Sequence, residues 1–331
     1  MPEPSPPTPK RRGRLFRFGA AFIVLSALVG YLVVQYVTGG AGAPGCKVVS
    51  GRDAETSYEF TPEQAVNAAT IAAVGTGRGM PQRAVTIALA TALQESGLRN
   101  IEHGDRDSLG LFQQRPSQGW GTEKQIMDPT YAAGVFYEHL AKVPDYTELP
   151  LTVAAQRVQH SGYPEAYAKH EPDAVLLSAA LTGRAAATLT CQGRQKATTA
   201  QATATGPDAV RAALVRDFGR DALQEAGAEV SDTAAASPSP SVTAEARGRT
   251  VTVPVPDAPK TDRTGRTERE RGWQLAHWAV ANSSALHIAQ VSYAGREWAA
   301  GSTDSQWRPA GGQGAGGAER SAGSVRIVTG Q

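Results

Sequence analysis

The sequence predicts a mainly α domain that follows a single transmembrane helix and precedes a small α/β module. Three observations support this fold class: an uncharged apolar stretch near the N-terminus, a central region with apolar residues at helical spacing, and a C-terminal region of alternating valines. The 331 residues leave room for about two domains, and a hydrophobic content of 41% is enough to bury a core. The formal net charge of +2 favours no nucleic-acid partner.

The apolar stretch Phe18–Val37 contains no charged residue and would rise about 30 Å as a helix, enough to cross a hydrocarbon core. Five basic residues lie just before it, within positions 10–17. This asymmetry places residues 1–17 in the cytoplasm and everything after the span outside. We therefore expect a single-pass protein of the cell membrane with an extracytoplasmic C-terminal part. A cleaved signal peptide, or a lipid anchor on Cys46, are the alternatives.

The only two cysteines, Cys46 and Cys191, flank the central region. Both lie on the outer side of the predicted span, where disulfides form and persist. A disulfide between them would join the two ends of the domain; the alternative is two unpaired thiols. We expect domain boundaries at 46–191 for the α domain, 192–206 for a linker and 207–331 for the α/β module, with a disordered insertion near 231–248.

Helix-start signals recur through the central domain. Thr61-Pro62-Glu63-Gln64 combines an N-cap, a first-turn proline and a reciprocal capping glutamine. A second helix begins near Pro81 and stops at Gly97, with apolar residues on one face between them. Asp128-Pro129 starts a third helix. The remaining expected helices are Leu151–Gln159, Pro164–His170 and Ala174–Leu181.

The C-terminal module alternates between helical and strand patterns. Val251, Val253 and Val255 predict a strand, which the neighbouring prolines Pro254 and Pro256 restrict to the edge of a sheet. The other expected elements are a helix marked by Val210, Leu214 and Phe218, a helix over Trp273–Leu286, a strand through Ala289, Val291 and Tyr293, and a strand through Val325 and Ile327. The four tryptophans of this module predict either a compact core or a binding face.

Glu95 is the candidate catalytic residue. It lies three residues after Ala92 and seven after Ala88, at the margin of the buried stripe of its helix. A carboxyl group there is partly desolvated and faces the negative end of the helix dipole, and both effects favour the protonated form that a general acid requires. The structural alternative is a solvated glutamate in the last turn of a helix.

The sequence around Glu95 resembles a known family. Gln94-Glu95-Ser96, followed by Gly110-Leu111-Phe112-Gln113 in an α-helical extracytoplasmic domain, is similar to the lysozyme-like domain of soluble lytic transglycosylases. In that family a Glu-Ser pair ends one helix, and a Gly-Leu-Met-Gln motif follows across a loop. The resemblance covers about residues 61–183. The order of anchor, domain and small module also resembles actinobacterial membrane-anchored cell-wall proteins.

The resemblance implies cleavage of the glycan strands of peptidoglycan. Glu95 would protonate the glycosidic oxygen and then accept a proton from the C6 hydroxyl of the same sugar, which closes an anhydro ring. Only one carboxylate is needed, because the substrate supplies the nucleophile, unlike in the two-carboxylate glycosidases. Gln113 would hydrogen-bond substrate, and Ser96 would position Glu95. Phe112, which stands where methionine is usual, is a candidate either for stacking on a sugar ring or for core packing.

The third motif of the family, usually Ala-Tyr-Asn-Ala-Gly, departs most in this chain. It should fall near Ala154–Gln159, where Gln156 occupies the position of the tyrosine and is the candidate substrate-binding residue. Tyr163 and Tyr167 follow a few residues later and are candidates to replace the missing side chain.

Other side chains near the motifs complete the set of candidates. Asp105 and Asp107 lie between Glu95 and Gln113, where a hydrolase would use one of them to activate water; the alternative is that they cap the loop. Trp120 is a candidate for stacking on a sugar or for core packing. Histidine and cysteine spacings that bind metal are absent from the sequence, so we expect neither a metal nor a cofactor.

Three functions are compatible with these patterns. The first is a membrane-anchored enzyme that cleaves peptidoglycan glycan strands. The second is a non-catalytic peptidoglycan-binding or scaffold membrane protein that kept the fold and lost the activity. The third is an interaction protein whose partner binds the C-terminal module. Glu95 favours the first function, whereas the missing tyrosine motif favours the second.

Overall fold

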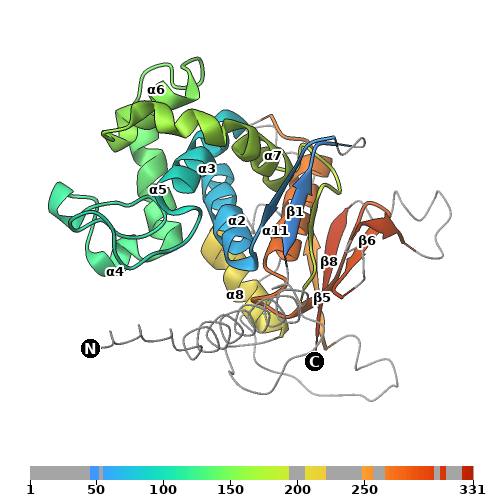
Figure 1. Cartoon of the computed structure of the whole chain (residues 1–331). Helices are drawn as coiled ribbons and strands as arrows, with labels where there is room; N and C mark the ends of the chain where they lie inside the picture. Colours follow the sequence, from blue (N-terminus) through green and yellow to red (C-terminus); the bar gives the residue numbers. More distant parts are fainter. Residues whose placement is uncertain are drawn as a thin grey trace, which may run out of the picture. The chain divides into compact units, whose positions relative to one another are not determined.

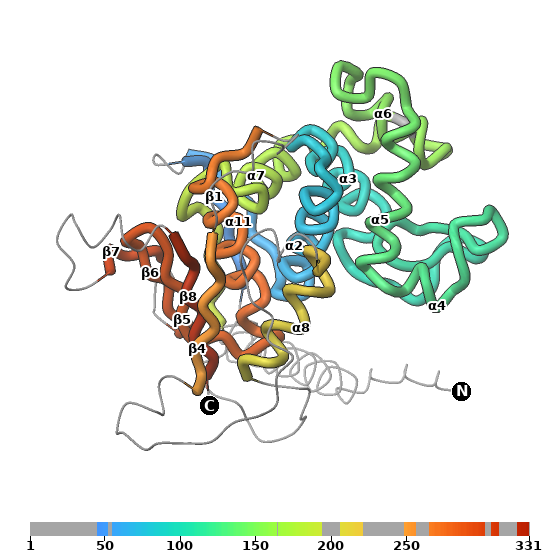
Figure 2. Tube along the Cα trace, turned by 180° about the vertical axis from the view of Figure 1, so that it is seen from behind, coloured from blue at the N-terminus to red at the C-terminus, as the bar shows by residue number. Residues whose placement is uncertain are grey.

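The structure, a computed structural model, describes residues 45–51, 55–193, 206–220, 248–255, 265–301, 306–310 and 323–330. Helices and two antiparallel sheets make up this part of the chain (Figures 1 and 2). The predicted transmembrane stretch Phe18–Val37 and the predicted insertion near 231–248 lie outside these ranges, apart from residue 248.

The predicted fold class is wrong. Residues that we expected to form a mainly α domain include a three-stranded antiparallel sheet of order β2-β1-β3, built from β1 (Cys46–Val49), β2 (Ser57–Phe60) and β3 (Leu189–Cys191). These strands have four, four and three residues, too few for an alternating pattern to be recognised in the sequence. Within the described ranges, no helix has the length and apolar character needed to span a membrane.

The helices of this region all lie between β2 and β3 in the chain. They are α2 (Pro62–Gly77), α3 (Gln82–Ser96), the 3-10 helix η1 (Pro116–Gln118), α4 (Glu123–Ile126), α5 (Pro129–Leu140), α6 (Leu151–Gln159), the 3-10 helix η2 (Pro164–His170) and α7 (Glu171–Leu181). The predicted starts at Thr61 and Asp128 are confirmed, because each side chain accepts backbone N–H groups of the first turn. The segment Pro164–His170 forms a 3-10 helix, although its pattern suggested an α-helix.

Helix α2 lies at the centre of the core. It packs against α3, α5 and α7, and also against α8 (Pro207–Phe218) and α11 (Glu268–Ala281) from the C-terminal region. Its small residues permit this close packing: a Cβ on Gly75 would lie 2.6 Å from the hydroxyl oxygen of Tyr137. That hydroxyl donates to the carbonyl of Ile71 at 3.0 Å, which fixes α5 on α2.

The C-terminal region forms a five-stranded antiparallel sheet of order β4-β8-β5-β6-β7. Its strands are β4 (Thr250–Pro254), β5 (Ile288–Tyr293), β6 (Arg296–Ala299), β7 (Arg308–Pro309) and β8 (Ser324–Thr329). The predicted positions of β4, β5 and β8 are confirmed, and β4 lies at an edge as its proline requires. Strand β7 has only two residues, too few for a strand pattern to be recognised in the sequence.

Helix α11 lies between this sheet and the central helices, as Figures 1 and 2 show, and it contacts β5, β8, α2 and α7. The four tryptophans of the region are buried, which makes them core residues in this structure. Three of them donate their indole N–H: Trp278 to Asp217 Oδ2 at 2.8 Å, Trp298 to the Cys191 carbonyl at 3.1 Å, and Trp307 to the Leu189 carbonyl at 2.9 Å. The described residues from 45 to 330 therefore share one core.

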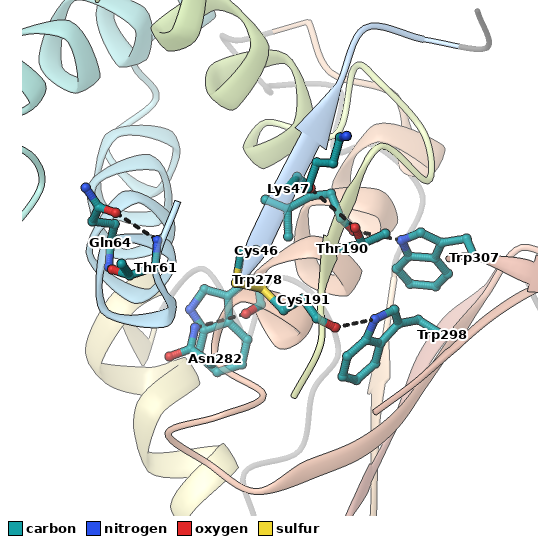
Figure 3. The surroundings of a disulfide bond; sticks show 11 residues. Cys46, Lys47, Thr61, Gln64, Thr190, Cys191, Trp278, Asn282, Trp298 and Trp307 are labelled. Carbon is teal, nitrogen blue, oxygen red and sulfur yellow. Dashed lines mark hydrogen bonds between the residues drawn. A yellow bond between two sulfur atoms is a disulfide. The ribbon is translucent and has the colours of Figure 1, made fainter. Parts of the chain in front are cut away.

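The predicted disulfide between Cys46 and Cys191 is present, with a Cα–Cα distance of 4.0 Å. The two cysteines are directly opposite each other on β1 and β3. Figure 3 shows that Trp298 donates to the carbonyl of Cys191, so the disulfide lies where β3 meets the C-terminal region. The disulfide joins β3 to β1, and the hydrogen bond from Trp298 joins β3 to β6.

His277 is a fully buried titratable group on α11. Its Nδ1 lies 2.8 Å from the carbonyl oxygen of Ala180, and its Nε2 accepts the N–H of Thr188 at 3.3 Å. These partners match the neutral ring with its proton on Nδ1. Burial lowers the pKa of His277 to about 4, although the bond to the Ala180 carbonyl acts in the opposite direction.

The burial of His277 predicts acid sensitivity. Since its folded pKa lies below the ordinary value of 6.5, the stability contribution is complete above pH 6.5 and is lost as the pH falls toward 4. The loss amounts to about 3 kcal/mol in unfolding free energy, from 1.36 kcal/mol per pKa unit. His277→Gln keeps a donor and an acceptor but does not titrate. Urea unfolding at several pH values should show a shallower acid loss in this variant, and equal losses would contradict the prediction.

Candidate active site

Glu95 lies in the last turn of α3 and is half-buried. The helix ends at Gly97, whose φ of 62° lies in the left-handed region that glycine adopts without strain. The amide of Gly97 donates to the carbonyl of Leu93, and that of Leu98 donates to the carbonyl of Ala92. This cap fixes the backbone immediately after Glu95. The position of the Glu95 side chain then depends on the side chains that contact it.

Tyr167 is the direct partner of Glu95. Its hydroxyl donates to Glu95 Oε1 at 2.7 Å, and its ring is fully buried. Burial is the main cause that raises the pKa of Tyr167 well above its usual range, and the negative charge of Glu95 adds to it. The hydroxyl therefore remains protonated and continues to donate at neutral pH. Tyr163, the other candidate for this position, is 79% exposed.

The side chain of Ser96 joins the helix end to the Gly110–Gln113 loop. Its Oγ lies 2.8 Å from the carbonyl oxygen of Leu111 and accepts the N–H of Arg99 at 3.2 Å. Ser96 is buried and contacts this loop, which brings the two sequence motifs together. Its positioning effect on Glu95 would thus act through the backbone of the helix end.

Gln113 folds back onto its own loop. Its φ is 48°, and its side-chain Nε2 donates to the Gly110 carbonyl at 3.2 Å. The amide oxygen lies against Gly104, where an added Cβ would be only 1.7 Å away. Glycine at position 104 is thus required for this conformation of Gln113.

The ring of Phe112 is a core element in this structure. It is fully buried and stacks on Phe136 with a centroid distance of 4.6 Å. Its carbonyl accepts the side-chain amide of Gln159 at 2.8 Å. The ring is therefore a packing residue and is not exposed for contact with a sugar. Gln159 anchors the loop through this hydrogen bond, a role that its local sequence pattern does not predict.

Gln156, at the expected tyrosine position, makes no hydrogen bond to Glu95 in the part of the chain that the structure describes. Its Nε2 donates to the carbonyl of Ser161 at 2.8 Å, and its buried Oε1 has no hydrogen-bond partner among the described residues. The contact with Glu95 comes instead from η2, beyond the expected motif. A second contact joins the same two elements, because His170 Nε2 lies 3.2 Å from Gln94 Oε1.

Asp107 and Trp120 are engaged in contacts within the protein. Asp107 accepts the N–H of Ser117 at 2.9 Å and pairs with Arg115 at 2.7 Å. The hydrogen bonds from Ser117 and then from Arg115 hold the pKa of Asp107 well below its usual range. Trp120 stacks on His139 with a centroid distance of 4.3 Å. In the described part of the chain, no group of three metal-binding side chains is found.

Comparison with known proteins bears on a different part of the chain. Residues 210–320 match the family model described as "VldE, C-terminal domain". The match covers about a third of the chain, from within α8 to the residues before β8, and so does not include the helices that carry Glu95 and Tyr167. No curated protein matches the chain.

Proposed function

We propose that the protein cleaves the glycan strands of peptidoglycan by the lytic transglycosylase mechanism, with Glu95 as general acid and base. The observation that carries this proposal is the 2.7 Å contact between Tyr167 Oη and Glu95 Oε1. It supplies a tyrosine partner for the candidate acid from a different position than the family motif. The joining of the helix end to the Gly-Leu-Phe-Gln loop through Ser96 supports the same assignment.

The two oxygens of Glu95 have different surroundings. Oε1 accepts the hydrogen bond from Tyr167, whereas no hydrogen bond to Oε2 is found in the described part of the chain. We therefore assign to Oε2 the proton transfers with the substrate. In the acid form it gives its proton to the glycosidic oxygen as the bond to the anomeric carbon breaks. It then accepts the proton of the C6 hydroxyl while that oxygen bonds to the anomeric carbon, which returns Glu95 to its acid form.

The loop carboxylates favour this route over hydrolysis. A hydrolase needs a second carboxylate as nucleophile or as base for water. Both oxygens of Asp107 have partners, Ser117 and Arg115, and these hydrogen bonds lower its pKa, which makes the carboxylate a weaker base for water. Asp105 is 94% exposed, and its ion pair with Arg106 is long, at 4.0 Å, so this contact orients the carboxylate only weakly. Hydrolysis by Asp105 remains an outcome that product analysis detects.

The proposal places the protein outside the cytoplasm, where peptidoglycan lies. The Cys46–Cys191 disulfide is of the kind that persists in an oxidising compartment. Protease added to cells whose outer barrier has been removed should degrade the protein. Full protection under conditions that digest a known exported protein would contradict this location.

The function is tested with the whole chain, because residues before and after 194–205 share one core. The purified protein is incubated with insoluble cell wall, and solubilised muropeptides and bound protein are measured together. Release of muropeptides supports the enzyme. Binding without release contradicts catalysis and supports the non-catalytic binding or scaffold function, and the lack of both contradicts a peptidoglycan substrate.

Tyr167→Phe should lower the rate of cleavage by about tenfold to a hundredfold. The change removes the donor to Glu95 and keeps the buried ring, so the carboxyl group loses its orientation while the fold survives. Muropeptide release at saturating substrate measures the effect. Tyr163→Phe is the matched control, because its side chain is exposed and should tolerate the same change. A loss confined to the Tyr163 variant would assign the role to that residue instead.

A further inference from the structure

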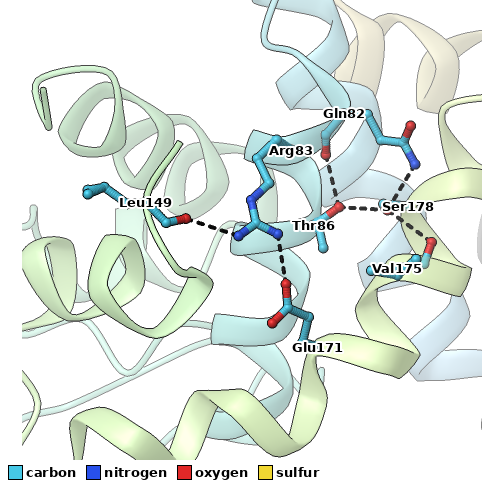
Figure 4. A network of polar contacts seen from close by, with 7 residues as sticks. All are labelled: Gln82, Arg83, Thr86, Leu149, Glu171, Val175 and Ser178. Atoms are coloured by element: carbon cyan, nitrogen blue, oxygen red, sulfur yellow. Dashed lines mark hydrogen bonds and ion pairs between the residues drawn. The ribbon is translucent and has the colours of Figure 1, made fainter. Parts of the chain in front are cut away.

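The segment that carries Tyr167 is held at both of its ends by one side chain. Residues 150–170 include α6 and η2, and they lead from Leu149 to Glu171 at the start of α7. Arg83 Nη1 lies 2.8 Å from Glu171 Oε1, and its Nη2 donates to the Leu149 carbonyl at 3.1 Å (Figure 4). A single guanidinium group thus binds both ends of the segment 150–170.

Arginine suits this double contact because its donors form a rigid planar group that can bind two acceptors at once. The side chain of Arg83 is 29% exposed and that of Glu171 is 40% exposed, so the pair is only partly screened by water. Lysine would offer a point charge to Glu171, but it lacks the geometry to bind both acceptors.

Arg83 and the candidate acid Glu95 belong to the same helix, α3. Arg83 lies in the first turn of α3 and Glu95 in its last turn, so about 18 Å separates them at 1.5 Å per residue. All residues from Ala84 to Leu93, which lie between them, are buried. Arg83 is therefore remote from the reacting atoms. On the segment 150–170, in contrast, Tyr167 contacts Glu95 and His170 contacts Gln94.

Helix α7 has separate contacts with α3. Thr86 Oγ1 lies 2.8 Å from Ser178 Oγ, and Gln82 Nε2 donates to Ser178 Oγ at 3.4 Å (Figure 4). Since these contacts do not involve Arg83, loss of Arg83 should leave α7 docked. The freed part would be the segment 150–170, together with the tyrosine that it presents to Glu95.

We propose that Arg83 is a positioning residue: by binding Leu149 and Glu171 together, it fixes the α6–η2 segment on α3 and thereby holds Tyr167 against Glu95. This inference rests on the proposed function for its catalytic consequence. Its structural part, the local fixation of residues 150–170, can be measured without any activity.

Hydrogen–deuterium exchange on the full chain tests the structural part. In Arg83→Gln, amides of residues 151–170 should exchange about tenfold faster, because hydrogen bonds to a charged group shift a local opening equilibrium by this order. Exchange in α2 and α5 should not change. Arg78→Gln is the matched control, since it removes a 3.1 Å ion pair to Glu138 that lies outside the segment. Unchanged exchange in 151–170, or an equal rise in all helices, would overturn the proposal.

A double-mutant cycle tests the catalytic consequence. Arg83→Gln and Tyr167→Phe should each lower kcat about tenfold or more with little change in KM, and the double variant should be no slower than Tyr167→Phe alone. Arg83→Lys should recover part of the loss because it keeps the charge beside Glu171. Additive losses would overturn an action through Tyr167. The exchange result separates a failure of this proposal from a failure of the proposed function.

Discussion

Glu95→Gln should reduce the release of muropeptides by about a hundredfold to ten-thousandfold, the usual contribution of a general acid–base group. Glutamine keeps the size of the side chain and an oxygen that can accept the hydroxyl of Tyr167, but it has no transferable proton. The fold and binding to cell wall should therefore be retained. Initial rates on insoluble peptidoglycan, with circular dichroism and a wall pull-down on the same samples, measure the three properties together.

The control for this prediction is Glu102→Gln, an identical change at an exposed position in the loop that follows α3. Its rate should equal that of the unmodified protein. A Glu95→Gln variant with full activity would remove Glu95 from the mechanism. Loss of wall binding in that variant would instead show that the carboxylate contributes to binding, and the rate alone would then no longer support an acid.

Removal of the disulfide should have the largest effect on stability. Cys46 and Cys191 are 145 positions apart, and the chain-entropy model assigns about 5 kcal/mol to the closure of so long a loop. Both residues are buried in paired strands, so the double variant Cys46→Ser, Cys191→Ser also places two hydroxyl groups in the core. The unfolding midpoint in urea should fall strongly, and a reducing agent should lower the midpoint of the unmodified protein in the same direction.

The double variant Cys46→Ser, Cys191→Ser serves as the control for effects of the reducing agent that do not involve the disulfide. A reducing agent should leave the midpoint of the double variant unchanged, because no other cysteine exists. A loss of less than about 1 kcal/mol in the double variant would contradict the expected role of the disulfide in stability.

Local signals allowed much of the helical structure to be predicted. Thr61 and Gln64 make the reciprocal cap that their spacing indicates, and α6 spans Leu151–Gln159 as its pattern suggests. The edge position of β4 followed from Pro254. These features depend on contacts within a few residues, so the sequence contains all the necessary information.

Features that depend on distant contacts were not predictable. Strand β3 forms because it pairs with β1, which lies far away in the sequence. The paired residues Lys47 and Thr190 are 143 positions apart, and Cys46 and Cys191 are 145 positions apart. Tyr167 reaches Glu95 across 72 positions because Arg83 and His170 fix the intervening segment on α3. The burial of Phe112 is likewise decided by Phe136, on a helix that follows later in the chain.

Product identity tests the proposed mechanism most directly. Muropeptides released by the unmodified full-length protein from purified peptidoglycan are analysed by mass spectrometry, with the reaction run in water enriched in heavy oxygen. We expect glycan ends that are lighter than the hydrolysis product by one water, contain an anhydro ring and carry no heavy oxygen. Reducing ends that carry heavy oxygen, or no released product from wall that the protein binds, would contradict the mechanism in which Glu95 acts as the acid and base and the substrate supplies the nucleophile.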